Sequence, residues 1–283
     1  VNLYLHVGSP LEDGRHPLDS LVQFADVRAA DRISARPARE LSLKTEGPFA
    51  KGLKGERNNL ILRAAALLRQ AVDRYDLGAA LNLQKELPVA SGIGGGSADA
   101  AAAMLILNQY WGIGFSEEAL QTLAVELGSD VPACMTGQAA IMRGTGENVT
   151  PVKSIDLPVV LVNPGAKLST EAVYKKFDAM GLGRGFVERQ MPDPADGVEV
   201  FARALNRFSN DLQEPAIALC SQIKDVLGLI SETEGVLLTR MSGSGATCFG
   251  IYKTQEEADR ASRYIAKRKR RWWVRATTLS GAR

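Results

Sequence analysis

Alternating apolar and polar positions open the chain and predict a β-rich beginning. Residues 1–7 alternate in the manner of a strand, and turn-forming residues follow before an apolar segment at 18–24. Glycine, proline and aspartate mark turns because they supply unusual backbone angles or bond their own backbone. We therefore expect a meander of strands up to about Lys44.

Helical spacing replaces alternation after the meander. Apolar or alanine side chains recur every three to four residues over 59–75, which predicts an amphipathic helix. A short strand over 80–84 leads into a glycine cluster, and the apolar run at 100–111 predicts a second helix. A serine cap and a glycine stop predict a third helix over 116–128, which places Asp130 in the loop just past its end.

A polar segment between Pro151 and Pro158 divides the chain. We predict a domain boundary there, with one domain over residues 1–154 and a second over 155–283. The second part alternates helical patterns with strand-like runs, which is typical of an α+β fold. Helices are expected at 169–180, 198–208 and 215–231, and strands at 159–162, 236–241, 247–252 and 272–279.

Charge and hydropathy argue against several classes of partner. The 283 residues carry 34 basic and 32 acidic side chains, a net charge of +2, so the overall charge does not favour nucleic acid. We interpret the basic run at 267–271, beside two tryptophans, as a solvated helix end and expect no nucleic-acid partner. No apolar run reaches the roughly 18 residues that a membrane span needs, so no membrane partner is expected.

The cysteines and histidines limit the chemistry further. Cys134, Cys220 and Cys248 lie far apart, which is typical of reduced thiols in a cytoplasmic protein. His6 and His16 are the two histidines. A histidine-rich zinc site or a Ser-His-Asp triad is therefore not expected.

A glycine-rich loop between a predicted strand and a predicted helix is the most informative segment. Residues 88–101 read PVASGIGGGSADAA, with four glycines within five residues. Glycine permits positive φ and lets backbone amides approach an anion, while a helix N-terminus adds unpaired N–H groups and a positive dipole. The loop is therefore a predicted phosphate cradle. A glycine-rich hairpin or close helix packing is the alternative.

Two widespread phosphate motifs do not fit this loop. A P-loop requires a lysine after the last glycine, and the dinucleotide fingerprint requires a glycine where Ser97 stands. The loop instead resembles that of the GHMP kinase superfamily, Pro-x-x-x-Gly-Leu/Ile-Gly-x-Gly-Ser-Ser-Ser/Asp/Asn-Ala. The chain departs from this pattern at Ala98, where the superfamily has a second serine, so one hydroxyl contact is either lost or replaced by a backbone amide.

The resemblance extends in order over nearly the whole chain, and within the superfamily it is greatest to kinases that act on a diphosphocytidyl sugar alcohol. It implies a two-domain α+β architecture, with an N-terminal domain similar to domain 2 of ribosomal protein S5 and a ferredoxin-like C-terminal domain. The matching segments are 2–5, 13–18, 59–65, 127–132, 144–147, 210–212 and 241–250.

The resemblance implies that ATP, with Mg²⁺, phosphorylates a hydroxyl of this small molecule. Asp130 is the implied general base, although as an isolated residue it reads as a turn or cap aspartate. Asn59 and Lys85 are implied near the adenine, although alone they read as a helix cap and a solvated lysine. The implied phosphate contacts are Pro88, Ser91, Gly92, Gly94, Gly95, Gly96 and Ser97. The metal ligands stay open.

On the substrate side, the resemblance implies four residues. Asn2 would lie near the reacting hydroxyl, His16 would hydrogen-bond the cytosine, and Tyr174 would stack on it. Arg15 stands where the family commonly has a tyrosine, and a guanidinium plane can also stack on a base. Taken alone, His16 could equally be a surface turn residue, and a tyrosine such as Tyr174 on an amphipathic helix is more often a core residue.

A second glycine loop, at Gly243, Ser244 and Gly245, is implied to close over the phosphates, although the bare pattern also fits a tight turn between strands. The family has a lysine directly before the residue matching Val1, and we expect the gene product to begin before Val1. A homoserine- or mevalonate-type kinase and a catalytically silent nucleotide-binding module are the alternative functions. We expect a monomer or a weak homodimer.

Overall fold

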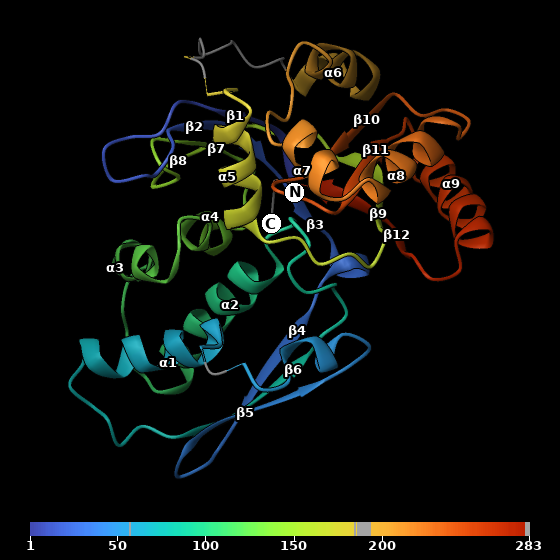
Figure 1. Ribbon diagram of the computed structural model, residues 1–283. Coiled ribbons are helices and arrows are strands. Elements are labelled where there is room, and N and C mark those ends of the chain that lie inside the picture. Colours follow the sequence, from blue (N-terminus) through green and yellow to red (C-terminus); the bar gives the residue numbers. More distant parts are fainter. Residues whose placement is uncertain (57, 184, 186–193, 281–283) are drawn as a thin grey trace. The chain divides into compact units, whose positions relative to one another are not determined.

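The computed structural model describes residues 1–56, 58–183, 185 and 194–280, which form two compact units (Figure 1). The first unit comprises Val1–Ala29, Ala90–Ile93 and Gly137–Arg283, and the second comprises Ala30–Val89 and Gly94–Thr136. The glycine loop therefore belongs partly to each unit. A single domain boundary after residue 154 stays a prediction.

A four-stranded antiparallel sheet in the first unit contains the start of the chain. Its strand order is β1 (Asn2–Val7), β2 (Leu18–Val22), β7 (Ala140–Arg143) and β8 (Asn148–Pro151). The alternation at the start of the sequence therefore predicted β1 correctly. Side chains of β1 such as Leu5 and Val7 enter the hydrophobic core of the unit.

A five-stranded antiparallel sheet forms the rest of the first unit's framework. Its order is β10 (Leu238–Met241), β11 (Cys248–Ile251), β9 (Leu157–Asn163), β12 (Trp273–Ser280) and β3 (Phe24–Ala25). The apolar run in β9 is buried because neighbouring strands flank it and helices cover it. The predicted strands of the second half are confirmed.

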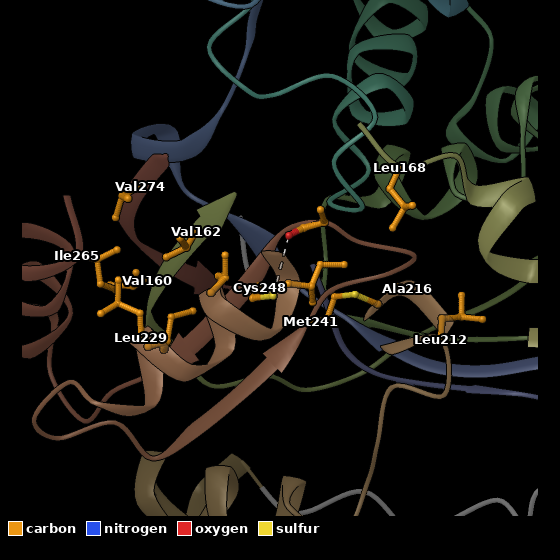
Figure 2. Close-up of a cluster of buried hydrophobic side chains, with 14 of the residues drawn as sticks. Val160, Val162, Leu168, Leu212, Ala216, Leu229, Met241, Cys248, Ile265 and Val274 are labelled. Atoms are coloured by element: carbon orange, nitrogen blue, oxygen red, sulfur yellow. Dashed lines mark hydrogen bonds between the residues drawn. The ribbon is translucent and has the colours of Figure 1, made fainter. Parts of the chain in front are cut away.

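The core of the first unit joins this sheet to two helices, α8 (Gln222–Ser231) and α9 (Gln255–Arg268). Figure 2 shows the buried side chains of this cluster, among them Val160 and Val162 of β9. Thr254 begins α9 with a capping box. The basic residues that follow are exposed, as expected of a solvated helix end.

The described residues of the first unit also contain α5 (Thr170–Ala179), α6 (Val198–Leu205) and α7 (Gln213–Leu219), with 3-10 turns η1 (Val27–Ala29) and η4 (Pro194–Asp196). The predicted helix over 215–231 is wrong as a single element. Cys220 has φ −144° and ψ 89°, which ends α7 and leaves α8 as a separate helix. Apolar spacing continues in both pieces, so periodicity alone did not report the break.

The second unit packs helices on a three-stranded sheet of order β4 (Arg32–Arg36), β6 (Ala79–Gln84) and β5 (Leu41–Glu46). β4 runs antiparallel and β5 parallel to β6. The helical elements are α1 (Leu60–Ala71), α2 (Gly95–Tyr110), α3 (Glu117–Ala124), α4 (Val131–Thr136), η2 (Ala50–Leu53) and η3 (Val125–Leu127). Alanines on α2 are buried against α1 and the sheet. Within the described ranges, no helix is both long and apolar enough to span a bilayer.

Candidate functional site

The two glycine loops meet backbone to backbone within the first unit. Thr247 N donates a hydrogen bond to Ser91 O at 3.1 Å, and Ser242 Oγ donates to Gly92 O at 2.9 Å. Gly92 has φ +75°, and a Cβ there would lie 2.6 Å from the backbone N and O of Gly245. No side chain fits at Gly92 without moving backbone.

Asn210 fixes the second glycine loop, which connects β10 to β11. Its Nδ2 donates to the carbonyl oxygens of Met241 and Gly243, both at 2.8 Å. Its Oδ1 accepts from Leu212 N at 3.0 Å. The Nδ2 group of Asn210 therefore positions the loop, while its Oδ1 binds the backbone at the start of α7. Sequence reasoning included Asn210 in a matching segment and gave it no role, because the loop carbonyls that it binds lie 31 and 33 residues away.

Asn2 lies beside the second glycine loop. Its backbone N donates to Ser242 Oγ at 3.1 Å, and its Nδ2 donates to Ser20 Oγ at 3.0 Å. At the start of α5, Thr170 Oγ1 lies 2.8 Å from Ser244 Oγ. The first unit thus brings together one end of the phosphate loop, the second glycine loop and a residue predicted to contact substrate.

His16 and Tyr174 also lie together in the first unit, as the predicted cytosine contacts should. The His16 ring is buried, and its Nδ1 lies 2.9 Å from Gly8 O. Its Nε2 lies 3.5 Å from Asp178 Oδ2, and its centroid is 5.0 Å from that of Tyr174. Phe177 meets the same imidazole edge-on at 5.8 Å. His16, in the connection between β1 and β2, is therefore held in place by its packing against α5 and is not a free turn residue.

Arg15 is exposed and already has two partners. Its Nε donates to Asp13 Oδ2 at 2.7 Å, and its Nη1 donates to Thr145 Oγ1 at 3.0 Å. These bonds hold the guanidinium plane in one orientation at the surface. The segment 144–147, quoted for the resemblance, is thereby joined to the segment that carries His16.

The start of α2 is open in the way a phosphate cradle requires. Gly94 is its N-cap with φ +69°, and a Cβ there would meet nothing within 4 Å. A Cβ on Gly96 would meet only Leu60 Cδ1, at 3.8 Å. Helix geometry leaves the first amides of α2 without partners inside the helix. The residues from Gly95 onward are helical, so the expectation of positive φ holds at Gly92 and Gly94 and is wrong for Gly95 and Gly96.

The departure at Ala98 is not compensated by its own amide. Ala98 N donates to Gly94 O at 2.9 Å, the first bond of the helix. This amide is therefore used inside the helix, and replacement of the lost hydroxyl by another backbone amide stays a prediction. Ser97, in the first turn of α2, keeps the first hydroxyl of the motif half-buried.

Lys85 is buried between two carboxylates and is not a solvated lysine. Its Nζ lies 2.6 Å from Asp31 Oδ2 and 2.7 Å from Asp99 Oδ2, and the side chains of Lys85, Asp31 and Asp99 are exposed by 3%, 3% and 8%. We call these three residues the buried ion cluster. Sequence reasoning missed both aspartates. The register that pairs Arg32 with Gln84 places Asp31 beside Lys85.

Electrostatics within the buried ion cluster are unequal because one ammonium faces two carboxylates. Burial and the neighbouring charge of Asp31 raise the pKa of Asp99 to about 6, despite the attraction of Lys85. Burial alone would lower the pKa of Lys85, but Asp99 and Asp31 together raise it above its ordinary value. Lys85 therefore stays charged, while Asp99 takes up a proton under mildly acidic conditions.

The contacts that the structure gives to Asn59 and Pro88 lie within the protein. Their predicted contacts with the nucleotide therefore stay predictions. Asn59 caps α1, because its Oδ1 accepts from Ile61 N at 2.9 Å. Its Nδ2 donates to Glu56 Oε2 at 3.0 Å. Pro88 is buried just before the loop.

Asp130 immediately precedes α4, a short helix that the sequence did not predict. Its carbonyl accepts from Cys134 N at 3.2 Å, while its side chain is exposed. The residue is thus placed as a helix-start aspartate with an accessible carboxylate. Its role as the catalytic base stays a prediction. Among the residues that the structure describes, no three His, Cys, Asp or Glu side chains gather as metal ligands.

Two family models match the chain. "GHMP kinases N terminal domain" matches residues 59–138, which include the whole glycine loop, and "GHMP kinases C terminal" matches residues 196–270. The fold and the phosphate-loop geometry thus define a kinase of the GHMP class, with the two-domain α+β architecture that the sequence predicted.

Full-length relatives narrow the class. The 4-diphosphocytidyl-2-C-methyl-D-erythritol kinase of Hyphomonas neptunium is 46% identical, covering 100% of this chain and 95% of the relative. That of Parvibaculum lavamentivorans is 43% identical, covering 99% and 96%. A crystal structure of 4-(cytidine 5'-diphospho)-2C-methyl-D-erythritol kinase matches with TM-score 0.77 and 33% identity, covering 100% and 97%. The chain therefore belongs to the 4-diphosphocytidyl-2-C-methyl-D-erythritol kinase family.

More distant structures share the fold alone. The mevalonate kinase of L. major matches with TM-score 0.68 at 14% identity, covering 95% of this chain and 90% of the other. Such identity carries no conclusion on substrate.

Proposed function

We propose that this chain transfers the γ-phosphoryl group of ATP to the 2-hydroxyl of 4-diphosphocytidyl-2-C-methyl-D-erythritol, a step of non-mevalonate isoprenoid synthesis, with ADP as the second product. Relatives at 46% and 43% identity, matched over almost their whole length, support this reaction. The observation that carries the proposal is the open start of α2, because a nucleotide's phosphates need unhindered backbone amides.

Phosphoryl transfer depends mainly on positioning and on stabilising negative charge. The amides of Gly95, Gly96 and Ser97 would receive the phosphates of ATP, aided by the positive end of the α2 dipole. Asp130 would orient the substrate hydroxyl in line with the γ-phosphorus and accept its proton as the new P–O bond forms. The bond from the γ-phosphorus to the β,γ-bridging oxygen then breaks, and ADP leaves.

Mg²⁺ is part of the proposal because it offsets the charge of the phosphates. No described group of three acidic or histidine side chains is arranged to hold the ion. That fits Mg²⁺ carried in by the nucleotide, since this ion is commonly held by phosphate oxygens, waters and one or two protein oxygens. The Ser97 hydroxyl, at the start of α2, is an oxygen suited to complete its shell, while Asp130 is reserved for the substrate hydroxyl.

The cytidine end of the substrate would bind at His16 and Tyr174. Their adjacent rings offer an aromatic face that suits a nucleobase, and His16 Nε2 would exchange its 3.5 Å contact with Asp178 for a hydrogen bond to the cytosine. The guanidinium of Arg15, held in plane by Asp13 and Thr145, would add a stacking surface. Asn2, beside the second glycine loop, would contact the sugar-alcohol end.

We expect the enzyme to act on a small molecule, without nucleic acid or membrane, as a monomer or weak homodimer. The free thiols of Cys134, Cys220 and Cys248 support a cytoplasmic, reducing setting.

ADP release measured with a coupled assay tests the function directly. The purified chain would be assayed with ATP and Mg²⁺ against 4-diphosphocytidyl-2-C-methyl-D-erythritol, mevalonate and homoserine in parallel. We expect turnover with the first substrate only. Turnover with mevalonate or homoserine alone would contradict the proposal. ATP binding without turnover of any substrate would instead identify a silent nucleotide-binding module.

A further inference from the structure

Asp31 binds the three residues that lead into the glycine loop. Its Oδ2 accepts from Lys85 Nζ at 2.6 Å, and its Oδ1 accepts from the backbone N of Glu86 at 2.6 Å and of Leu87 at 2.9 Å. The backbone of Lys85 is also fixed, because Lys85 N donates to Glu46 O at 2.7 Å. The approach to the loop therefore has a defined path.

Asp99 binds the same lysine from the other end of the glycine loop. It lies in α2, 14 residues after Lys85, and its Oδ2 accepts from Lys85 Nζ at 2.7 Å. The ion pair therefore ties the residue before the loop to the helix after it. A flexible segment of this length otherwise samples many end-to-end separations, and joining its ends removes that freedom.

The buried ion cluster also lies directly at the first glycine of α2. A Cβ on Gly95 would be 3.5 Å from Lys85 Nζ and 3.7 Å from Asp31 Oδ2. The ammonium and its two carboxylates therefore support the backbone whose amides are proposed to receive phosphate. Any shift of Lys85 would be transmitted to this turn, because protein interiors are packed too densely to absorb it.

Stability alone is a poor explanation for such a cluster. Burying charges costs desolvation free energy, and buried ion pairs are often no more stabilising than apolar residues of the same size. Here three ions share one buried site with a formal charge of −1, and Asp31 makes three separate hydrogen bonds with defined directions. These features fit a device that fixes geometry.

We infer that Asp31 and Asp99 are positioning residues for ATP binding: through Lys85 they close the glycine loop at its base and hold the start of α2 in its phosphate-receiving geometry. Neither carboxylate needs to touch the nucleotide for this role. The inference deepens the proposed kinase function and rests on the glycine loop as its ATP site.

Asp31→Asn tests the inference, because it removes the charge and one acceptor while keeping the shape. We expect the KM for ATP to rise at least tenfold, while the KM for the diphosphocytidyl substrate changes less than threefold. The matched control is Asp76→Asn, in the same unit, which removes the exposed partner of Arg74. This control should leave both KM values unchanged. A merely structural role of Asp31 would lower the melting temperature and leave both KM values of the folded enzyme unaltered, which would overturn the inference.

Asp99→Asn provides a second variant should Asp31→Asn fail to fold, since its amide oxygen can still accept from Lys85. We expect a raised KM for ATP here as well, and Asp99→Glu should restore part of the loss by reinstating the charge. Calorimetric titration with a non-hydrolysable ATP analogue separates this inference from the proposed reaction. If the wild type turns over no substrate but binds the analogue at least tenfold more tightly than both aspartate variants, the positioning role stands without the reaction. Equal affinities would overturn it.

Discussion

A substitution at a single glycine at the start of α2 can change ligand binding without destabilising the fold. Gly96 has a helical backbone and room for a methyl group, with Leu60 Cδ1 at 3.8 Å. Alanine favours a helix over glycine by up to about 1 kcal/mol. Gly96→Ala should therefore keep or slightly raise the melting temperature. The methyl group would occupy space meant for phosphate, so we expect the affinity for ATP, measured by calorimetry, to fall at least tenfold.

Gly92→Ala provides the contrast for this experiment. Its Cβ would meet the backbone of Gly245 at 2.6 Å and would demand a positive φ. This variant should lose stability as well as affinity. Unchanged ATP affinity in folded Gly96→Ala would contradict the phosphate-cradle proposal.

Asp130→Asn tests the proposed base, because it keeps the size of the side chain and removes its capacity to take a proton. We expect turnover to fall by about two to four orders of magnitude, the usual range for a positioned acid–base group, with little change in the KM for ATP. If Asp130 only caps α4, the loss would instead be on the order of 1 kcal/mol of stability, with near-normal turnover. Glu126→Gln, a nearby exposed carboxylate, is the matched control and should behave as wild type.

At the scale of elements, the carboxyl of Asp99 in α2 makes stability depend on pH. Its pKa is raised from the ordinary 3.8 to about 6 in the fold, mainly by burial. The folded protein therefore binds this proton more tightly than the unfolded chain. The resulting stabilisation is fully present below pH 3.8 and is lost as the pH rises through 6.

Urea unfolding of wild type and Asp99→Asn at pH 5 and pH 7.5 measures this contribution. Acidification from pH 7.5 to 5 should stabilise the wild type relative to the variant by on the order of 1 kcal/mol. The titrating groups outside the buried ion cluster are common to both proteins, so their effects largely cancel in the difference. Parallel pH dependences would show that Asp99 does not carry the shifted pKa.

Elements with strong periodicity and clear caps were predictable from the sequence, and weakly marked ones were not. Asn59 and Ser116 begin α1 and α3 as side-chain caps, and the sequence located these helices from spacing and cap residues together. The short α4 has too few residues for a period to emerge. The sequence did not predict the break between α7 and α8 at Cys220, because apolar residues recur at helical spacing on both sides of it. Local patterns report local order, and these features depend on tertiary packing.

At the scale of the whole molecule, the resemblance predicted which residues to examine but not how they are held. Asp31 and Lys85 are 54 residues apart, and their ion pair depends on the register between β4 and β6. The contact of Gly92 with the second glycine loop joins segments separated by 150 residues. Such convergence follows from topology and register, which a single sequence does not display.

The melting temperature of the whole chain should respond separately to a ligand at the ATP site and to a ligand at the proposed cytosine site. A ligand that binds only the folded state adds about 2.7 kcal/mol at 100 times its Kd, which for a chain of this size raises the melting temperature by about 5–10 °C. ATP should produce such a shift, and so should cytidine 5′-monophosphate, which carries only the proposed cytosine end. Uridine 5′-monophosphate is the matched ligand control, because it differs at the hydrogen-bonding edge of the base, and it should give a smaller shift.

His16→Ala then assigns the cytidine shift to its site. The variant loses a buried ring in contact with Tyr174 and Phe177, so its own melting temperature without ligand is the reference for each shift. If His16 binds cytosine, the shift with cytidine 5′-monophosphate should vanish while the shift with ATP persists. If both shifts shrink together, the histidine only supports the fold of the first unit, because a general loss of order weakens every ligand alike. Persistence of the cytidine shift alone would place the cytosine elsewhere and remove His16 from substrate recognition.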